Sequence, residues 1–181
     1  MTLDRKKLLP FILSALVIIA DQVTKALIVK MIPYGHIGVN LFDELIRIVH
    51  VSNLGVAFSF GYNWPLVLRR IAFGIVPLVV IGLVVYVYLR NNSFNQLQRW
   101  AIAGIIGGGI GNIIDRFFRA EGVVDFIDVK FFGIFGLNRW PTFNVADSAV
   151  VVCGIILLVS FIVSTVQESK QKKQQDESKG E

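Results

Sequence analysis

The sequence has a single cysteine, Cys153, which excludes an internal disulfide and any metal site built from several thiolates. Charged residues are also scarce, at 17% of the 181 residues, whereas 54% are hydrophobic. The mean hydropathy is +0.64. A soluble domain of this length rarely contains so little charge. The composition therefore excludes an ordinary soluble protein and favours a membrane protein.

The net charge of +5 does not indicate a nucleic-acid partner, because the basic residues form no face interleaved with aromatic side chains. They are densest instead in short segments beside the ends of apolar blocks, where basic residues act as topology signals. These segments contain Arg5, Lys6, Lys7, Arg90, Arg99, Lys170, Lys172, Lys173 and Lys179. The positive-inside rule then predicts that both termini are cytoplasmic.

Four apolar blocks are long enough to cross a bilayer as helices, which takes roughly 20 residues. They cover residues 8–29, 71–89, 100–118 and 145–166. The first block is too long for a secretory signal and lacks a small-x-small cleavage site, so we expect a retained helix. We predict one integral domain over residues 1–166. The tail 167–181 is low in hydrophobicity and is predicted to be disordered and cytoplasmic.

The segments between the blocks contain strand patterns. HVSNLGVAFSFGYN, residues 50–63, alternates and then breaks at glycine, and VVDFIDVKFFGIF, residues 123–135, also has a strand pattern. LFDELIRIV, residues 41–49, has a helical period and predicts a helix lying along the membrane interface. The predicted fold class is therefore a membrane all-α protein with short external strands and an interfacial helix.

Glycine is concentrated in the third block, at positions 104, 107, 108, 109 and 111. In lipid, small residues four apart let helix backbones approach closely, so this block is predicted to be a packing helix. The second block carries no charge and contains Pro77, which is expected to kink it.

Charged side chains at the centre of a membrane helix cost roughly 3 kcal/mol each, so they usually pair or mark a functional site. Asp21 and Lys25 are four residues apart and can neutralise each other. Asn112, Asp115 and Arg116 share a face near the end of the third block, where Asp115 and Arg116 could form a salt bridge. Each set can be purely structural, as an ion pair or an interfacial anchor, or can organise a polar site.

Two more carboxylates lie on the segment that joins the third and fourth blocks, Asp125 in VVDF and Asp147 in NVAD. Two carboxylates in a low dielectric do not both ionise easily, so one keeps a proton near neutral pH. Such a dyad can activate a water with its anionic member and protonate a leaving amine with the other. Asp128 is near, but strand alternation would aim it away from Asp125. Alternatively, Asp147 only serves the first turn of a helix that Asn144 caps.

Five segments together resemble the lipoprotein signal peptidase family, the aspartic endopeptidases that remove signal peptides from bacterial prolipoproteins. They occur in the family's order and span almost the whole chain: DQVTK (21–25), NLGVAF (53–58), GGGIGNIIDR (107–116), VVDF (123–126) and FNVADS (143–148). The resemblance implies a four-helix enzyme of the bacterial cytoplasmic membrane with both termini cytoplasmic. It also implies a small extracytoplasmic β-rich cradle. We expect a monomer that needs no metal or other cofactor.

By motif, the resemblance places the catalytic dyad on Asp125 and Asp147. The other matching positions would shape the site or bind substrate: Asp21, Lys25, Asn53, Gly55, Ala57, Phe58, Gly108, Asn112, Asp115, Arg116, Asn144 and Ala146. The implied substrate is a prolipoprotein whose lipobox cysteine already carries diacylglyceryl, held among membrane lipids and cleaved just before that cysteine. Because a helix N-terminus favours an anion, Asp147 is predicted to be the ionised member, leaving the shared proton on Asp125.

Two other functions fit the apolar composition. A small proton-coupled transporter could use Asp21, Lys25 and Asp115 as a relay, although such proteins place polar groups near the midplane and contain internal repeats. A membrane assembly factor could dock through its glycine-rich helix, but that function leaves the paired acidic motifs unexplained.

Overall fold

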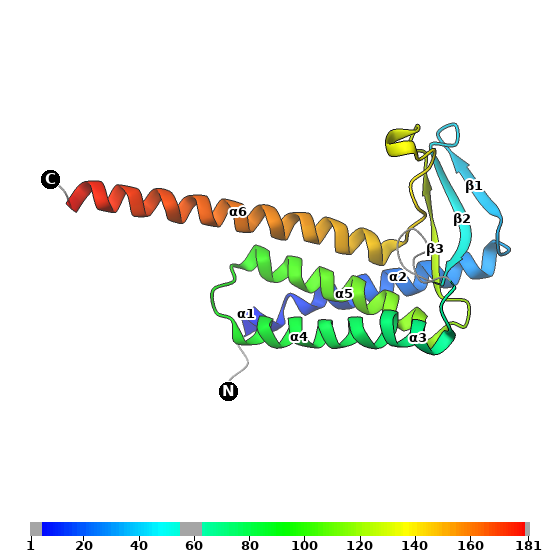
Figure 1. Cartoon of the computed structure of the whole chain (residues 1–181), viewed down its shortest axis with the longest axis horizontal. Coiled ribbons are helices and arrows are strands. Elements are labelled where there is room, and N and C mark those ends of the chain that lie inside the picture. Colours follow the sequence, from blue (N-terminus) through cyan, green and yellow to red (C-terminus); the bar gives the residue numbers. More distant parts are fainter. Residues whose placement is uncertain (1–4, 55–62, 180–181) are drawn as a thin grey trace.

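The computed structural model describes residues 5–54 and 63–179. In chain order, its elements are α1 (Arg5–Leu8), α2 (Phe11–Met31), β1 (Ile37–Leu41), β2 (Ile46–Asn53), α3 (Leu66–Arg70), α4 (Val76–Arg90), α5 (Gln96–Phe118), β3 (Val123–Val129) and α6 (Val145–Lys179). A π-helical turn, Ile71–Ile75, joins α3 to α4, and a 3-10 turn, Ile134–Gly136, follows β3. The long helices form a bundle and the sheet stands at one end of it, opposite both termini (Figure 1).

Four helical segments are long and apolar enough to cross a membrane: Arg5–Met31, Val67–Arg90, Gln96–Phe118 and Val145–Gln171. Large apolar side chains are exposed along α4 and α6, as expected where helices face lipid. The chain is therefore a membrane-embedded four-helix protein with a small sheet, as the sequence predicts.

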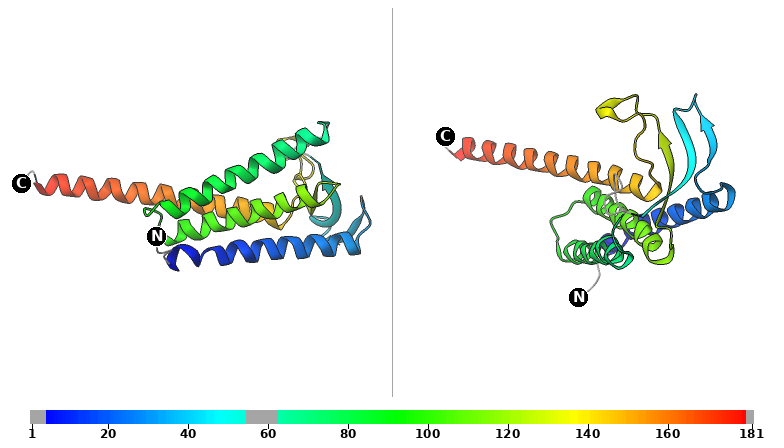
Figure 2. Two further views of the ribbon diagram at one scale, coloured as in Figure 1. Left: turned by 90° about the horizontal axis from the view of Figure 1, so that it is seen from below. Right: turned by 45° about the vertical axis from the view of Figure 1, so that its right-hand side comes forward.

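Helix α5 is the centre of the bundle, since it packs against α2, α4 and α6. Figure 2 shows it between α2 and α4 in the left-hand view. Glycine makes this close approach possible: a Cβ atom on Gly107 would lie 2.8 Å from Ser14 Cα of α2. On Gly108 it would collide with the carbonyl oxygen of Ala146 at the start of α6. The predicted packing role of the glycine-rich block is confirmed.

Helix α5 begins a turn earlier than residue 100 because a capping box starts it. The Asn95 side chain accepts a hydrogen bond from Gln98 N at 2.9 Å, and the Gln98 side chain accepts one from Asn95 N at 3.1 Å. These two bonds satisfy amides that the first turn of a helix leaves without partners.

The three strands form an antiparallel sheet in the order β1-β2-β3. The strand predicted over residues 123–135 is confirmed for Val123–Val129, and a 3-10 turn at Ile134–Gly136 takes the place of its last part. The interfacial helix predicted over residues 41–49 is wrong, because Leu41 ends β1 and Ile46 begins β2. Between them, the three consecutive residues Phe42–Glu44 have a left-handed backbone conformation with positive φ, which cannot continue a right-handed helix. The β-branched side chains of IRIVHV then favour a strand over a helix.

Two further points concern the second and fourth helices. Pro77 lies in the first turn of α4, and the π-helical turn that precedes it accommodates the missing proline N–H. The fourth helix does not end near residue 166 but continues to Lys179, past the rest of the bundle (Figure 1). Its last turns contain Gln, Glu and Lys and no glycine or proline, a composition that favours helix.

We predict that Gly108→Ala destabilises the protein, because the added methyl group meets a backbone carbonyl that only a shift of α6 can relieve. The expected loss is about 1–3 kcal/mol in the free energy of unfolding, the usual range for overpacking. Thermal unfolding in detergent measures it. Gly154→Ala is the matched control, because a Cβ atom there meets nothing within 4 Å. Equal melting temperatures for the two variants would contradict the close approach.

Candidate functional site

A lysine within the membrane helices lies at the centre of the polar site. Lys25 Nζ is 2.8 Å from Asp21 Oδ2 on its own helix and 2.9 Å from Asp115 Oδ2 on α5. It also donates to Asn112 Oδ1 at 2.9 Å. Lys25 and both carboxylates have no exposed surface. The Asp21–Lys25 pair is confirmed, and a second acid and an amide complete the three hydrogen bonds that an ammonium group can donate.

The two acids also hold the elements that follow α5. Asp21 Oδ1 accepts a hydrogen bond from Ala146 N at the start of α6, at 3.0 Å. Asp115 Oδ2 accepts one from Val124 N of β3, at 3.2 Å. Asp115 Oδ1 pairs with Arg119 Nε at 2.9 Å. Asp115 therefore forms its ion pairs with Lys25 and Arg119, whereas the sequence suggested Arg116.

Asn144 contacts both members of the proposed dyad. Its backbone N donates to Asp147 Oδ2 at 3.2 Å, and Asp147 N donates to its side-chain Oδ1 at 2.9 Å, which caps α6. Its Nδ2 donates to Asp125 Oδ1 at 2.7 Å. Asn144 is fully buried, so its own side chain is shielded from water. Helix capping and the meeting of the two acids are thus not alternatives, since one residue produces both.

Asn112 connects the lysine to the second acid. Its Oδ1 accepts hydrogen bonds from Lys25 Nζ at 2.9 Å and from Asn144 Nδ2 at 3.1 Å. Its Nδ2 donates to Asp147 Oδ1 at 2.7 Å. Because an amide has one acceptor side and one donor side, the ammonium group determines which side faces Asp147.

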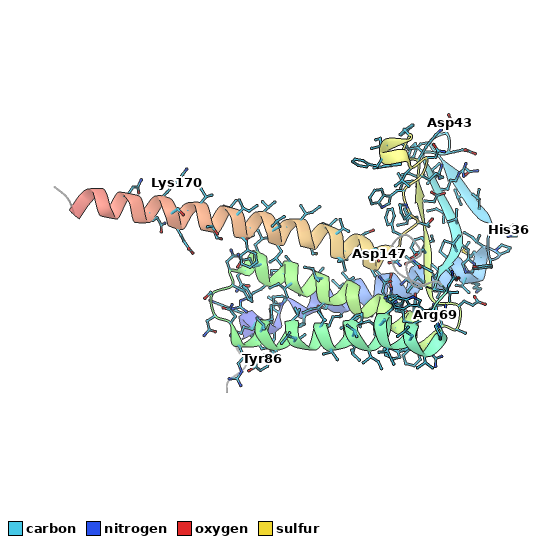
Figure 3. All side chains as sticks on the ribbon, viewed as in Figure 1. His36, Asp43, Arg69, Tyr86, Asp147 and Lys170 are labelled. Atoms are coloured by element: carbon cyan, nitrogen blue, oxygen red, sulfur yellow. The ribbon has the colours of Figure 1, made fainter. Side chains whose placement is uncertain are left out.

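Asp125 and Asp147 line one cavity of about 900 Å³ where the sheet meets the bundle. Figure 3 shows Asp147 at the start of α6, beside the lower part of the sheet. Polar side chains of Asn53 and Arg116 line the same cavity, and its apolar wall consists of residues such as Trp140, Phe143, Val151 and Val152. The cavity thus combines two acids with an apolar surface that continues onto the lipid-facing side of α6.

Burial, and after it the nearby charge of Asp147, raise the pKa of Asp125 from its ordinary 3.8 to about 7. Hydrogen bonds from Asn144 and Asn53 and the charge of Lys25 oppose the shift. Asp125 is 3% exposed, whereas Asp147 is half-buried. At neutral pH, Asp125 therefore retains a proton much more readily than an ordinary aspartate does.

Asp128 lies outside the site, as strand alternation predicts. Its Oδ1 accepts a hydrogen bond from Arg139 Nε at 2.6 Å, and the two residues form a salt bridge near the start of β2. In the sheet, Asp128 is opposite Arg47, and Asp125 is opposite Val51.

The remaining candidates differ in what they contribute. Gly108 and Ala146 bring no polar side chain, and they allow α5 to approach the first turn of α6. Gly55, Ala57 and Phe58 lie outside the described residues. Within residues 5–54 and 63–179, no three His, Cys, Asp or Glu side chains are placed to hold a metal ion together.

Two residues of the network are absent from the sequence-based set. Gln22 Nε2 donates to Asp115 Oδ1 at 3.2 Å and to Gly111 O at 3.1 Å, which ties α2 to α5. Arg119 pairs with Asp115, four residues earlier on the chain. The spacing that relates Asp21 to Lys25 could have identified Arg119. No spacing pattern identifies Gln22, because Gly111 and Asp115, to which it donates, lie far from it in the sequence.

Comparisons with known proteins relate this architecture to a family. The sequence model of the family described as signal peptidase (SPase) II matches residues 13–163. A lipoprotein signal peptidase of Treponema pallidum (strain Nichols) is 48% identical over 93% of this chain and 91% of its own length. The one from Borrelia turicatae (strain 91E135) is 46% identical over 89% of this chain and 94% of its own.

Solved structures agree with this assignment. One, described as a bacterial membrane enzyme determined by the in meso method at 2.3 Å resolution, superposes with a TM-score of 0.73 at 28% identity. The alignment covers 86% of this chain and 88% of that structure. A second bacterial membrane enzyme, at 1.9 Å resolution, gives a TM-score of 0.69 at 27% identity over 84% and 91% of the two chains. The chain belongs to the signal peptidase II family.

Proposed function

We propose that the chain removes signal peptides from diacylglyceryl-modified prolipoproteins, cutting immediately before the lipidated cysteine, with Asp125 and Asp147 as the catalytic dyad. Membership of the signal peptidase II family supports the substrate class. The observation that carries the chemistry is the bridge through Asn144, which hydrogen-bonds one acid through its side chain and the other through its backbone.

Within this proposal the two acids have different protonation states. Asp147 is the anion, because it accepts hydrogen bonds from Asn112 Nδ2 and Asn144 N at the N-terminus of α6. Asp125 holds the proton, in line with its raised pKa. Asp147 then takes a proton from water, which attacks the scissile carbonyl carbon. Asp125 donates its proton to the amine of the lipidated cysteine as the peptide bond breaks.

The cavity offers a place for both parts of such a substrate. An extended peptide can lie beside Ser52 and Asn53, at the end of β2, within reach of both acids. Acyl chains can remain in lipid along Val151 and Val152, which are 59% and 54% exposed on α6. The substrate would therefore not have to leave the bilayer before cleavage.

The transporter hypothesis is not favoured by the arrangement of its proposed relay. Asp21, Lys25 and Asp115 are fully buried, and they bond to one another and to fixed partners on α5, α6 and β3, so they form a fixed network. An assay of diacylglyceryl-modified proprotein in detergent separates this hypothesis and the assembly-factor hypothesis from the proposal. Only a peptidase releases a free signal peptide.

We also propose that the chain is a monomer in the bacterial cytoplasmic membrane, with its dyad on the extracytoplasmic side. Residues 1–166 would form one peptidase domain. The buried Lys25, Asn112 and Asn144 side chains have hydrogen-bond partners on α2, α5, β3 and α6, so these residues need none from a second copy. The termini and the sheet lie at opposite ends of the bundle (Figure 1). The dense basic segments at the terminal end then support a cytoplasmic location for both termini.

We predict that Asp125→Asn and Asp147→Asn each lower the cleavage rate by about 10³-fold or more, because neither amide can replace its acid in proton transfer. The release of signal peptide from purified enzyme measures the rate. Asp128→Asn is the matched control, since its carboxylate pairs with Arg139 and not with the dyad. Retained activity in either dyad variant, with the control also active, would refute the assignment.

The raised pKa of Asp125 predicts a pH dependence. The folded protein keeps a proton that the unfolded chain releases near 3.8. This contribution to stability is therefore complete below about pH 4 and is lost as the pH rises through about 7. Cleavage needs the same proton, so the rate should fall as the pH rises through about 7.

In Asp147→Asn, a carboxyl-carbon NMR titration should show a lower pKa for Asp125, because a repelling charge is gone. A pKa that remains near 7 in that variant would contradict the coupling.

We predict that Lys25→Met destabilises the protein by about 3–5 kcal/mol, because two buried carboxylates lose their shared counter-ion. Unfolding in detergent measures the change. Lys30→Met is the matched control, since Lys30 is an exposed lysine of the same helix and should show no comparable change. A Lys25 variant that is as stable as the control would show that the network does not hold the helices.

A further inference from the structure

Four arginines gather around a second, smaller cavity that the proposed chemistry does not use. Arg69 and Arg70 end α3, and Arg116 and Arg119 lie at the end of α5. Their side chains line a cavity of about 30 Å³ together with Phe73 and Asn53. This cavity adjoins the larger one, since Arg116 lines both.

None of the described lining residues of this cavity is an Asp or Glu. Arg119 pairs with Asp115, and Arg116 faces the charges of Asp147, Asp125 and Asp115, so the positive charges that no described acid of the cavity balances are those of Arg69 and Arg70. In the described part of the chain, Arg69 Nε and Nη1 are buried and have no hydrogen-bond partner. Burying a donor without an acceptor costs about 1–3 kcal/mol, and more for a charged group. Arg69 therefore requires an acceptor from outside the described residues, and a negatively charged one suits it best.

The position of the cavity indicates where that acceptor comes from. Arg69 and Arg70 lie at the outer end of the span Val67–Arg90, and Arg116 lies in the last turn of the span Gln96–Phe118. Figure 3 shows Arg69 at the end of the bundle that carries the sheet. The cavity is thus at the level where helices leave the bilayer, which lipid headgroups occupy.

The adjoining helix surface is apolar. Leu68 and Ile71 are each 45% exposed and Ile75 is 46% exposed, so an apolar strip begins beside the arginines. The ring of Phe73 stacks on Trp64 at a centroid distance of 5.5 Å, which places two aromatic rings at the same level. A positively charged cavity above an apolar strip matches a lipid with an anionic headgroup and acyl chains better than it matches a free anion.

We propose that this arginine cavity binds the phosphate of an anionic phospholipid, whose acyl chains lie along Leu68, Ile71 and Ile75. A guanidinium group suits phosphate because its planar donors match two phosphate oxygens at once. A cavity of about 30 Å³ is larger than the roughly 10–15 Å³ that one water needs, so one phosphate oxygen can enter it. The site would adjoin the peptide-binding cavity, with which it shares Asn53 and Arg116, and it does not depend on the proposed peptidase activity.

Native mass spectrometry of the full chain in a neutral detergent tests the proposal, with phosphatidylglycerol and a diacylglycerol of the same acyl chains as probes. Phosphatidylglycerol should bind the wild type, and diacylglycerol should not. Arg69→Gln should weaken binding by about tenfold or more, the effect of losing a charge-assisted hydrogen bond. Arg90→Gln is the matched control, because it removes the same charge from an exposed position at the other end of the span. It should leave the affinity within about twofold.

Further variants and a competitor make each outcome decisive. Arg69→Lys keeps the charge and should bind more tightly than Arg69→Gln, and Arg70→Gln should repeat the loss if Arg69→Gln does not fold. Equal binding by wild type and the Arg69 and Arg70 variants would overturn the site, and so would equal losses in Arg69→Gln and Arg90→Gln. Displacement of the lipid by millimolar inorganic phosphate would assign the cavity to a free anion and overturn the lipid assignment.

Discussion

The burial of the Lys25 ammonium group is the constraint on which the rest of the structure depends. A lone charge in a low dielectric is too unfavourable to persist, so the lysine must be surrounded by acids and acceptors. The chain meets this requirement with Asp21 from α2, and with Asp115 and Asn112 from α5. The remaining oxygens of the two acids then hold Ala146 N of α6 and Val124 N of β3. One buried cation thereby determines how two helices, the start of a third and strand β3 meet.

The buried Lys25 also positions the two acids of the proposed dyad, through Asn112 and Asn144. Asn112 turns its oxygen to Lys25, so its amino group must face Asp147, and Asn144 then spans the distance to Asp125. The two acids experience different surroundings in consequence. Asp147 lies half-buried at a helix N-terminus among hydrogen-bond donors, whereas Asp125 lies 3% exposed on a strand. That difference favours the anion on one acid and the proton on the other, which the proposed chemistry requires.

The sequence predicts those parts of the site that depend on local spacing. Asp21 and Lys25 are one helical turn apart, and Asn144 and Asp147 have the spacing of a cap and its first turn, so both contacts follow from the chain alone. The pairing of Lys25 with Asp115 and the bridge from Asn144 to Asp125 join residues far apart in sequence, and only the packing of α2, α5 and β3 creates them. The interfacial helix fails for a related reason. Residues 41–49 have a helical period, but the left-handed backbone of Phe42–Glu44 and the pairing of β2 with β1 and β3 form a hairpin instead.

The charges around the proposed dyad are a further reason for the raised pKa of Asp125. Asp21 and Asp115 carry two negative charges, and Lys25 and Arg119 carry two positive charges, so this part of the network is neutral. In the larger cavity, Arg116 is the one cation among the described lining residues and it faces two carboxylates, Asp147 and Asp125, so its single charge cannot balance both. Ionisation of Asp125 would place an excess negative charge where burial already disfavours it, and its pKa rises for that reason. The network that holds the helices together therefore also sets the protonation of the proposed dyad, since any further cation close to Asp125 would compete with the shared proton.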